Sequence, residues 1–178
     1  MIVLGVDPGT LITGYGVIES RNGRMKILEC DAIRNRSVQS MPRRLERIFE
    51  RLTTVIDRYH PDEFAIETAF YGKNAQSALK LGHARGAAML AAVTREIPTT
   101  EYSPREVKKA IVGTGAASKE QVQYMVKSLL RMKTIPRFYD TTDALAVALC
   151  HVHRGVKPTS QFRDWKAYVK THPNRVRR

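Results

Sequence analysis

The chain has 178 residues, 43% of them hydrophobic, which is enough to bury the core of one domain and too few for two well-packed ones. Its 30 Lys and Arg against 17 Asp and Glu give a net charge of +13, which favours a polyanionic partner such as nucleic acid. Two distant cysteines indicate neither a disulfide framework nor a zinc site, and no apolar run or signal peptide suggests a membrane. We therefore expect a cytoplasmic protein with no membrane partner.

The first sixty residues predict three antiparallel strands and one helix. A buried strand at 2–6 stops at the turn Asp7-Pro8-Gly9, and strands at 14–19 and 25–32 flank the hairpin signal Arg21-Asn22-Gly23. From 42 to 59 the apolar residues recur at helical spacing, which predicts an amphipathic helix.

The remaining pattern alternates strands with helices. Short strands are expected at 63–67 and 99–102, and the alanine-rich stretch 74–96 between them predicts a long helix. Three further helices are expected at 104–112, at 119–130 after the capping box Ser118/Gln121, and at 142–153. This order predicts an α/β domain over 1–155, with a five-stranded mixed sheet flanked by helices.

Residues 156–178 differ from this body in composition. They hold seven Lys and Arg against one Asp, which gives +6, so we expect a basic C-terminal tail that is partly mobile. Its aromatic residues Phe162, Trp165 and Tyr168 interleave with basic ones at helical spacing. They suit docking of the tail on the body, DNA contact or, least of all, a membrane surface.

Four acidic residues lie where core packing does not explain them. Asp7 and Glu67 each end an apolar strand, and strand ends are where the sites of α/β sheets collect. Asp140 and Asp143 are three residues apart at a helix start, so both project on one side of its first turn. Each acid also has a plainer interpretation: a turn residue, a solvated strand end, or an N-cap at Asp140 with Asp143 as its N3 partner.

The four carboxylates would meet only if the two strand ends and the helix start were neighbours. Their mutual repulsion would then have to be offset, and hard divalent cations with oxygen ligands are the usual means. Two Mg²⁺ ions about 4 Å apart, which Mn²⁺ could replace, would activate a water and stabilise the leaving oxygen of a phosphodiester displacement. The joint pattern therefore favours a metal-dependent nuclease.

Motifs along residues 1–155 strengthen this interpretation through their order and spacing. They are Asp7-Pro8-Gly9-Thr10, Gly14-Tyr15-Gly16, Ala65-Ile66-Glu67, Lys73-Asn74 with Ser77 to Gly82, and Asp140-Thr141-Thr142-Asp143-Ala144-Leu145-Ala146. Together they resemble the RuvC family of bacterial crossover junction endodeoxyribonucleases. The resemblance implies a ribonuclease H-like fold and a homodimer that resolves four-way Holliday junctions by two symmetric Mg²⁺-dependent nicks, leaving 5′-phosphate and 3′-hydroxyl ends. It also implies RuvA and RuvB, the branch-migration proteins, as partners.

The resemblance further assigns roles to individual residues. Asp7, Glu67, Asp140 and Asp143 are expected to be the catalytic metal ligands; some relatives carry histidine at the position of Asp140. Lys108 and Lys119 are expected to contact the scissile backbone beside them, although a lone lysine on a helix is usually just a solvated charge.

The segment after Glu67 is expected to contact DNA. The resemblance suggests that Phe70 stacks against unpaired bases at the junction centre. Tyr71 is a weaker candidate for the same role, and Lys73 is a further DNA-binding candidate. Without the resemblance, packing of these aromatics beneath the following helix would be favoured.

Small residues recur every four positions in the long helix, at Ala78, Gly82 and Gly86. Two glycines inside a helix cost about 1 kcal/mol each relative to alanine, so a close contact should offset them. Packing against the sheet and packing against a partner helix across a two-fold axis suit the residues equally, and the resemblance favours the partner helix.

Three other functions compete with this one. A sugar kinase or actin-like ATPase would need a second lobe, for which the chain is too short. A ribonuclease H-like nuclease acting on structured RNA would show itself by cutting RNA junctions. A non-catalytic module that binds branched DNA would keep all its activity without Asp7.

Overall fold

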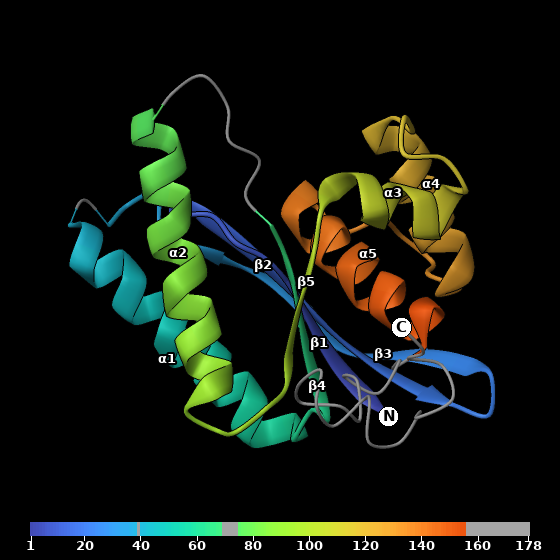
Figure 1. Ribbon diagram of the computed structural model, residues 1–178, viewed down its shortest axis with the longest axis horizontal. Coiled ribbons are helices and arrows are strands. Elements are labelled where there is room, and N and C mark those ends of the chain that lie inside the picture. Colours follow the sequence, from blue (N-terminus) through green and yellow to red (C-terminus); the bar gives the residue numbers. More distant parts are fainter. Residues whose placement is uncertain (39, 69–74, 156–178) are drawn as a thin grey trace, which may run out of the picture.

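A computed structural model describes residues 1–38, 40–68 and 75–155. Its five strands form one sheet in the order β3-β2-β1-β4-β5, in which β1 pairs antiparallel with β2 and parallel with β4 (Figure 1). The strands are β1 (Ile2–Asp7), β2 (Ile12–Arg21), β3 (Arg24–Arg34), β4 (Glu63–Glu67) and β5 (Thr99–Tyr102). The predicted five-stranded mixed sheet is therefore confirmed. β2 and β3 are longer than predicted because their pairing runs from the hairpin turn to Ile12 and Arg34.

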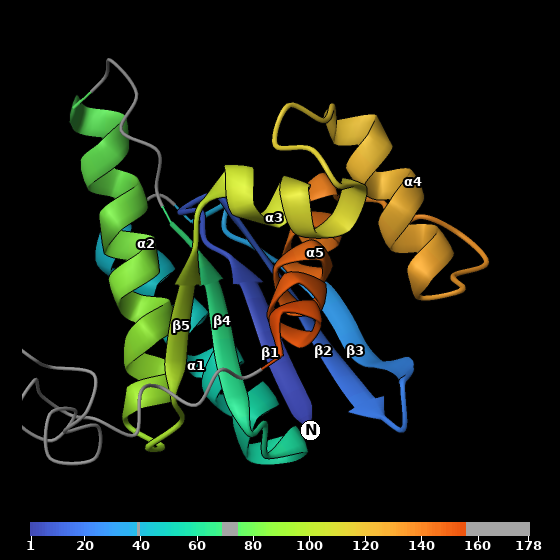
Figure 2. The same ribbon diagram turned by 45° about the vertical axis from the view of Figure 1, so that its right-hand side comes forward.

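Helices cover both faces of the sheet. They are α1 (Met41–Tyr59), α2 (Ala75–Val93), α3 (Pro104–Val112), α4 (Lys119–Leu129) and α5 (Tyr139–Arg154). α1 and α2 lie on one face, and α5 lies on the other with α3 and α4 packed beside it (Figures 1 and 2). All the predicted helices are present. None of the helices in the described ranges combines the length and hydropathy that a membrane span requires.

Alternation along β1 decides which face receives its last residue. Val3 belongs to the core beneath α5, whereas Leu4 and Val6 belong to the core beneath α1 and α2. Because successive side chains of a strand point to opposite faces, Asp7 lies on the same face as Val3 and Gly5, which is the face of α5.

Three glycines let α5 lie close against the sheet. A Cβ at Gly5 would lie 2.7 Å from the backbone nitrogen of Ala148, and one at Gly16 would lie 2.5 Å from Cδ2 of Leu145. A Cβ at Gly14 would collide with the carbonyl oxygen of Asp140. Since any larger residue at these positions would push the helix outward, these glycines set how near the start of α5 comes to the sheet.

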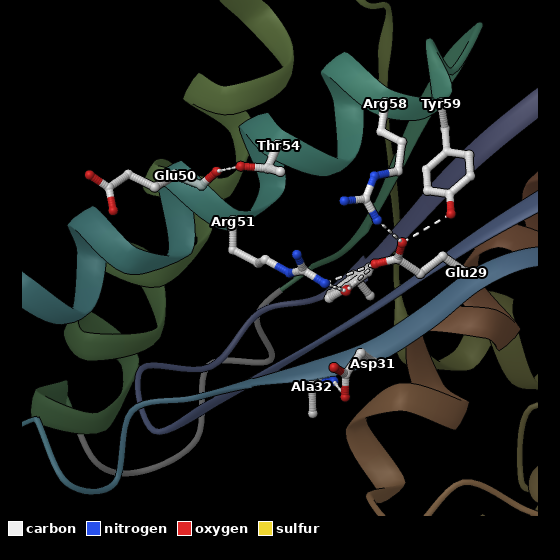
Figure 3. Close-up of polar contacts among 9 residues, drawn as sticks. Glu29, Asp31, Ala32, Glu50, Arg51, Thr54, Arg58 and Tyr59 are labelled. Carbon is white, nitrogen blue, oxygen red and sulfur yellow. Dashed lines mark hydrogen bonds and ion pairs between the residues drawn. The ribbon is translucent and has the colours of Figure 1, made fainter.

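A polar network fastens α1 to β2 and β3 (Figure 3). The Glu29 carboxylate, on β3, accepts hydrogen bonds from the hydroxyl of Tyr15 at 2.6 Å and from that of Tyr59 at 3.0 Å. Arg51 and Arg58, about two turns apart on α1, form ion pairs with the same carboxylate at 2.9 and 3.0 Å. The second half of α1 is thereby held beside the middle of β3.

Candidate active site

The end of the sheet positions Asp7 and Glu67 side by side. Val6 of β1 pairs with Ile66 of β4, and the two acids are the next residues along these parallel strands. Phe64 and Ile66 point into the α1 and α2 core, so alternation places Glu67 on the α5 face, as it does Asp7. The predicted meeting of the two strand ends is confirmed.

The first turn of α5 brings the other two acids to the same place. Asp140 and Asp143 lie on the face of the sheet that carries Asp7, because α5 crosses β1 and β2 at the glycines described above. The helix begins at Tyr139 with Phe138 as its N-cap, three residues earlier than predicted. The interpretation of Asp140 as an N-cap is therefore wrong, since the residue already lies inside the first helical turn.

A pocket of about 300 Å³ joins three of the acids to both predicted lysines. Its polar lining is Asp7, Glu67, Asp143, Lys108 and Lys119, and its apolar walls are Pro104, Val107, Val122 and Ala146. The Nζ atom of Lys119 lies 3.7 Å from Oδ2 of Asp143. Asp140 does not line this pocket, although its charge is close enough to act on its neighbours.

Capping boxes fix the two helices that carry the lysines. The Ser118 hydroxyl accepts from the backbone of Gln121, as predicted, and places Lys119 in the first turn of α4. Ser103 and Glu106 form a second box at the start of α3, one turn before Lys108. We did not predict this second box, although the Ser-Pro-Arg-Glu sequence carries the same signal.

Burial and crowded charges dominate the electrostatics of the pocket. Burial, followed by the charges of Glu67, Asp143 and Asp140, raises the pKa of Asp7 well above its usual value. Burial, followed by the charge of Asp143, raises the pKa of Glu67 to about 6, although Lys119 and Lys108 oppose the shift. Asp7 and Glu67 lie close enough for each carboxyl group to shift the pKa of the other.

The donor set fits hard divalent cations. All four acids offer carboxylate oxygens, and a bound cation would relieve the repulsion that helps to raise the pKa values of Asp7 and Glu67. Within the described ranges, no group of three or more His, Cys, Asp or Glu side chains already has metal-binding geometry.

Several predicted residues lie outside the described ranges. Phe70, Tyr71 and Lys73 belong to the segment between β4 and α2, and the basic tail at 156–178 follows α5. Their predicted DNA contacts and tail docking stay predictions.

Comparisons with known proteins agree with this architecture. The family model described as crossover junction endodeoxyribonuclease RuvC matches residues 3–151. The RuvC of Salinibacter ruber is 45% identical over 177 residues, covering 99% of both chains, and that of Saccharophagus degradans is 52% identical over 152 residues, covering 85% of this chain and 87% of its own. The solved structure of T. thermophilus RuvC in complex with Holliday junction substrate superposes with a TM-score of 0.82 at 34% identity, covering 86% of this chain and 94% of its own.

These matches also account for the fold. The sheet order and the flanking helices are those of a ribonuclease H-like domain, as the resemblance implied. A family model that spans most of the sequence and relatives that align over nearly its full length identify the same group of nucleases. The chain therefore belongs to the RuvC family of crossover junction endodeoxyribonucleases.

Proposed function

We propose that this nuclease resolves Holliday junctions by nicking two opposing strands symmetrically, leaving 5′-phosphate and 3′-hydroxyl ends. The observation that carries the proposal is the convergence of Asp7, Glu67 and Asp143 with two lysines in one pocket at the sheet end. The net charge of +13 supports a nucleic-acid substrate, and the T. thermophilus relative is in complex with such a junction.

The residues of the pocket divide the chemical work. Asp7, Glu67, Asp140 and Asp143 would hold two Mg²⁺ ions, which would supply an activated water and charge stabilisation at the leaving oxygen. Lys108 and Lys119 would bind the scissile phosphate, and Lys119 also orients Asp143 through their contact at 3.7 Å. The apolar walls from α3 and α4 would shield the reacting phosphate from bulk water.

The exposed face of α2 supports a homodimer. Leu79, Gly82, Gly86 and Leu90 share one side of the helix, opposite the alanines that are buried in the core with α1. A Cβ at either glycine would meet no described atom within 4 Å, so the alternative of packing against the sheet is wrong. A second copy of α2 packed across a two-fold axis would use this face and would set two equivalent pockets for paired nicks.

Two further parts of the proposal extend beyond this domain. RuvA and RuvB are the partners that the family resemblance suggests. Residues 156–178 form a separate basic tail on this proposal, and their charge of +6 would add to DNA affinity.

A nicking assay on a synthetic mobile four-way junction tests the proposed function. With Mg²⁺ we expect matched cuts in opposing strands, and with chelator, or on linear duplex of the same sequence, we expect none. Asp7→Asn should lower the nicking rate at least about 100-fold while junction binding persists, because phosphate contacts supply most of the affinity. A matched carboxylate control is Glu46→Gln, which changes an exposed residue on α1 that pairs with Arg43 at 2.7 Å.

Three results would contradict the proposal. Equal cutting of linear duplex would remove the structural selectivity, and equal cutting of an all-RNA junction would favour a nuclease for structured RNA. Full activity of Asp7→Asn would leave a non-catalytic role for the pocket. Equal loss in Glu46→Gln would show that the effect is not specific to the pocket.

A further inference from the structure

A second hollow, of about 860 Å³, lies at the same end of the sheet as the acids. It is formed where β3 ends, α1 passes and the chain enters α5, and none of its lining residues belongs to the acidic pocket. We call it the arginine groove, and its lining is Ile12, Ala32, Ile33, Arg34, Arg36, Ser37, Arg47, Glu50, Arg51 and Phe138.

The residues that line the groove have a net positive charge. Its lining holds four arginines and one acid, Glu50. Arg51 pairs with Glu29 at 2.9 Å, but Arg34, Arg36 and Arg47 are exposed and form no ion pair with any residue that the structure describes. Clustered, unpaired guanidinium groups repel one another, so the groove favours a ligand with several negative charges.

The Phe138 ring contacts the guanidinium groups of two arginines beside the groove. The guanidinium carbon of Arg34 lies 5.7 Å from the centroid of the Phe138 ring, and that of Arg137 lies at the same distance. These cation–π contacts hold both guanidinium groups beside the start of α5 and leave their positive charges in place. Phe138 is also the N-cap of α5, two residues before Asp140, so it links the arginine groove to the acidic site.

The groove lies within a few nucleotides of the proposed cleavage point. Asp7 pairs with Gly14, and Gly14 pairs with Ala32 of the groove. Two strand spacings separate Asp7 from Ala32, or about 10 Å, and duplex DNA rises about 3.4 Å per base pair along each strand. About three nucleotides therefore bridge a phosphate held at Asp7 and one held at the near edge of the groove, beside Ala32.

We propose that the arginine groove binds the phosphate backbone of the DNA arm that leaves the cleavage site, about three nucleotides from the cut. This inference rests on the proposed function, because it takes the DNA at the acidic pocket as its starting point. A planar guanidinium matches phosphate oxygens in a two-point hydrogen bond, which suits three arginines lining one path. The groove would thereby hold one arm at a fixed angle to the site.

Charge-removing variants test the groove directly. In chelator, which prevents cutting, Arg34→Gln with Arg47→Gln should weaken junction binding about 10-fold at moderate salt. The plot of log affinity against log salt should become flatter by about two units per protomer, because about 0.9 unit accompanies each lost phosphate contact. The charge-retaining pair Arg34→Lys with Arg47→Lys should restore most of the affinity.

A matched control removes two charges from the far end of the same strands. Arg21 and Arg24 pair across the β2–β3 hairpin and are both exposed. The hairpin lies nine residues along β2 from Ile12, or about 30 Å. Arg21→Gln with Arg24→Gln should change binding less than about 2-fold, and a loss equal to that of the groove variant would overturn the proposal.

Neutral linkages in the DNA locate the contact. Short runs of methylphosphonate, stepped outward from the nick that the wild type makes, remove phosphate charge one position at a time. A run about three nucleotides from the nick should weaken wild-type binding but not binding by the doubly Gln-substituted groove variant. The absence of any run with such dependence would overturn the proposal and leave an acidic protein as the alternative ligand.

These outcomes are separate from those of the proposed function. A wild-type protein that fails to cut junctions contradicts the nuclease, whatever the groove binds. A wild type that cuts normally, with a groove variant that binds as the wild type does, contradicts the groove alone. A Lys-substituted variant as weak as the Gln-substituted one, with a lowered midpoint of thermal unfolding in both, would show that the arginines serve structure and not charge, and would overturn the proposal.

Discussion

Burial and neighbouring charge act in the same direction on the acids of the pocket. Glu67 is held beside Asp7 at the ends of two paired strands, and burial followed by the charge of Asp143 raises its pKa to about 6. At neutral pH the Glu67 carboxylate is therefore charged in the metal-free protein. This charge destabilises the folded state, because water solvates the same carboxylate better in the unfolded chain. The crowded carboxylates lower the free energy of unfolding of the metal-free protein, and they also make the site suited to binding cations.

Removing that charge should stabilise the metal-free protein. We expect Glu67→Gln to raise the free energy of unfolding at pH 7 by about 1 to 2 kcal/mol in chelator, since a shift of one pKa unit corresponds to about 1.4 kcal/mol. With Mg²⁺ the order should reverse, because binding to the folded state stabilises the wild type more than a variant lacking one ligand. Urea unfolding of both proteins, with and without Mg²⁺, measures the two differences. Equal stabilisation of both proteins by Mg²⁺ would remove Glu67 from the metal ligands.

Sequence patterns could identify the acids but not all of their surroundings. Asp7 and Glu67 follow apolar strands, so their place at one sheet end could be predicted, as could the shared helical turn of Asp140 and Asp143. No pattern in the sequence marked Arg34 as part of a functional surface. It differs from a solvated surface charge only because β3 and α5 place it against Phe138, and that placement depends on the tertiary fold.

At the scale of elements, Glu29 joins two segments that local patterns cannot connect. Burial alone would raise its pKa, but hydrogen bonds from Tyr15 and Tyr59 and the charges of Arg51 and Arg58 outweigh burial and lower it. The resulting link holds α1 against β3 (Figure 3) and so supports one wall of the arginine groove. The residues of this link come from three separate elements, β2, β3 and α1, which is why periodicity within each one predicted α1 but not its attachment.

The Glu29 link should make stability depend on pH in a defined direction. A carboxyl whose pKa is lowered by folding adds stability above its unfolded pKa, and this stability is lost as the pH falls through the folded pKa. Glu29→Gln should therefore cost about 1.5 to 3 kcal/mol at pH 7, the range for hydrogen bonds to a charged group, and progressively less below about pH 4. Denaturant titrations across pH 3 to 7 measure the difference. A cost that stays constant with pH would show that packing, not charge, holds α1.

At the scale of the whole molecule, the face of α2 gives the dimer proposal its physical basis. Leu79 and Leu90 are 61% and 57% exposed. Large apolar side chains that are exposed together on one helix face are typical of a surface that binds another protein. Glycines at Gly82 and Gly86 would let a partner backbone approach closely between these leucines. The described part of the chain supplies no such contact, because α2 enters the core through its other side, with Ala84, Ala88, Ala91 and Ala92.

Charged substitutions on this face should separate the protomers. We expect Leu79→Lys with Leu90→Lys to convert a dimer to a monomer in sedimentation, because four like charges would face one another in a water-excluding interface. The matched control is Tyr124→Lys, which replaces a residue of α4 that is 70% exposed and should leave the dimer intact. The monomer should still unfold cooperatively, since neither leucine belongs to the buried core. It should also release single nicks in place of paired ones, and paired nicking by a proven monomer would contradict the symmetric arrangement.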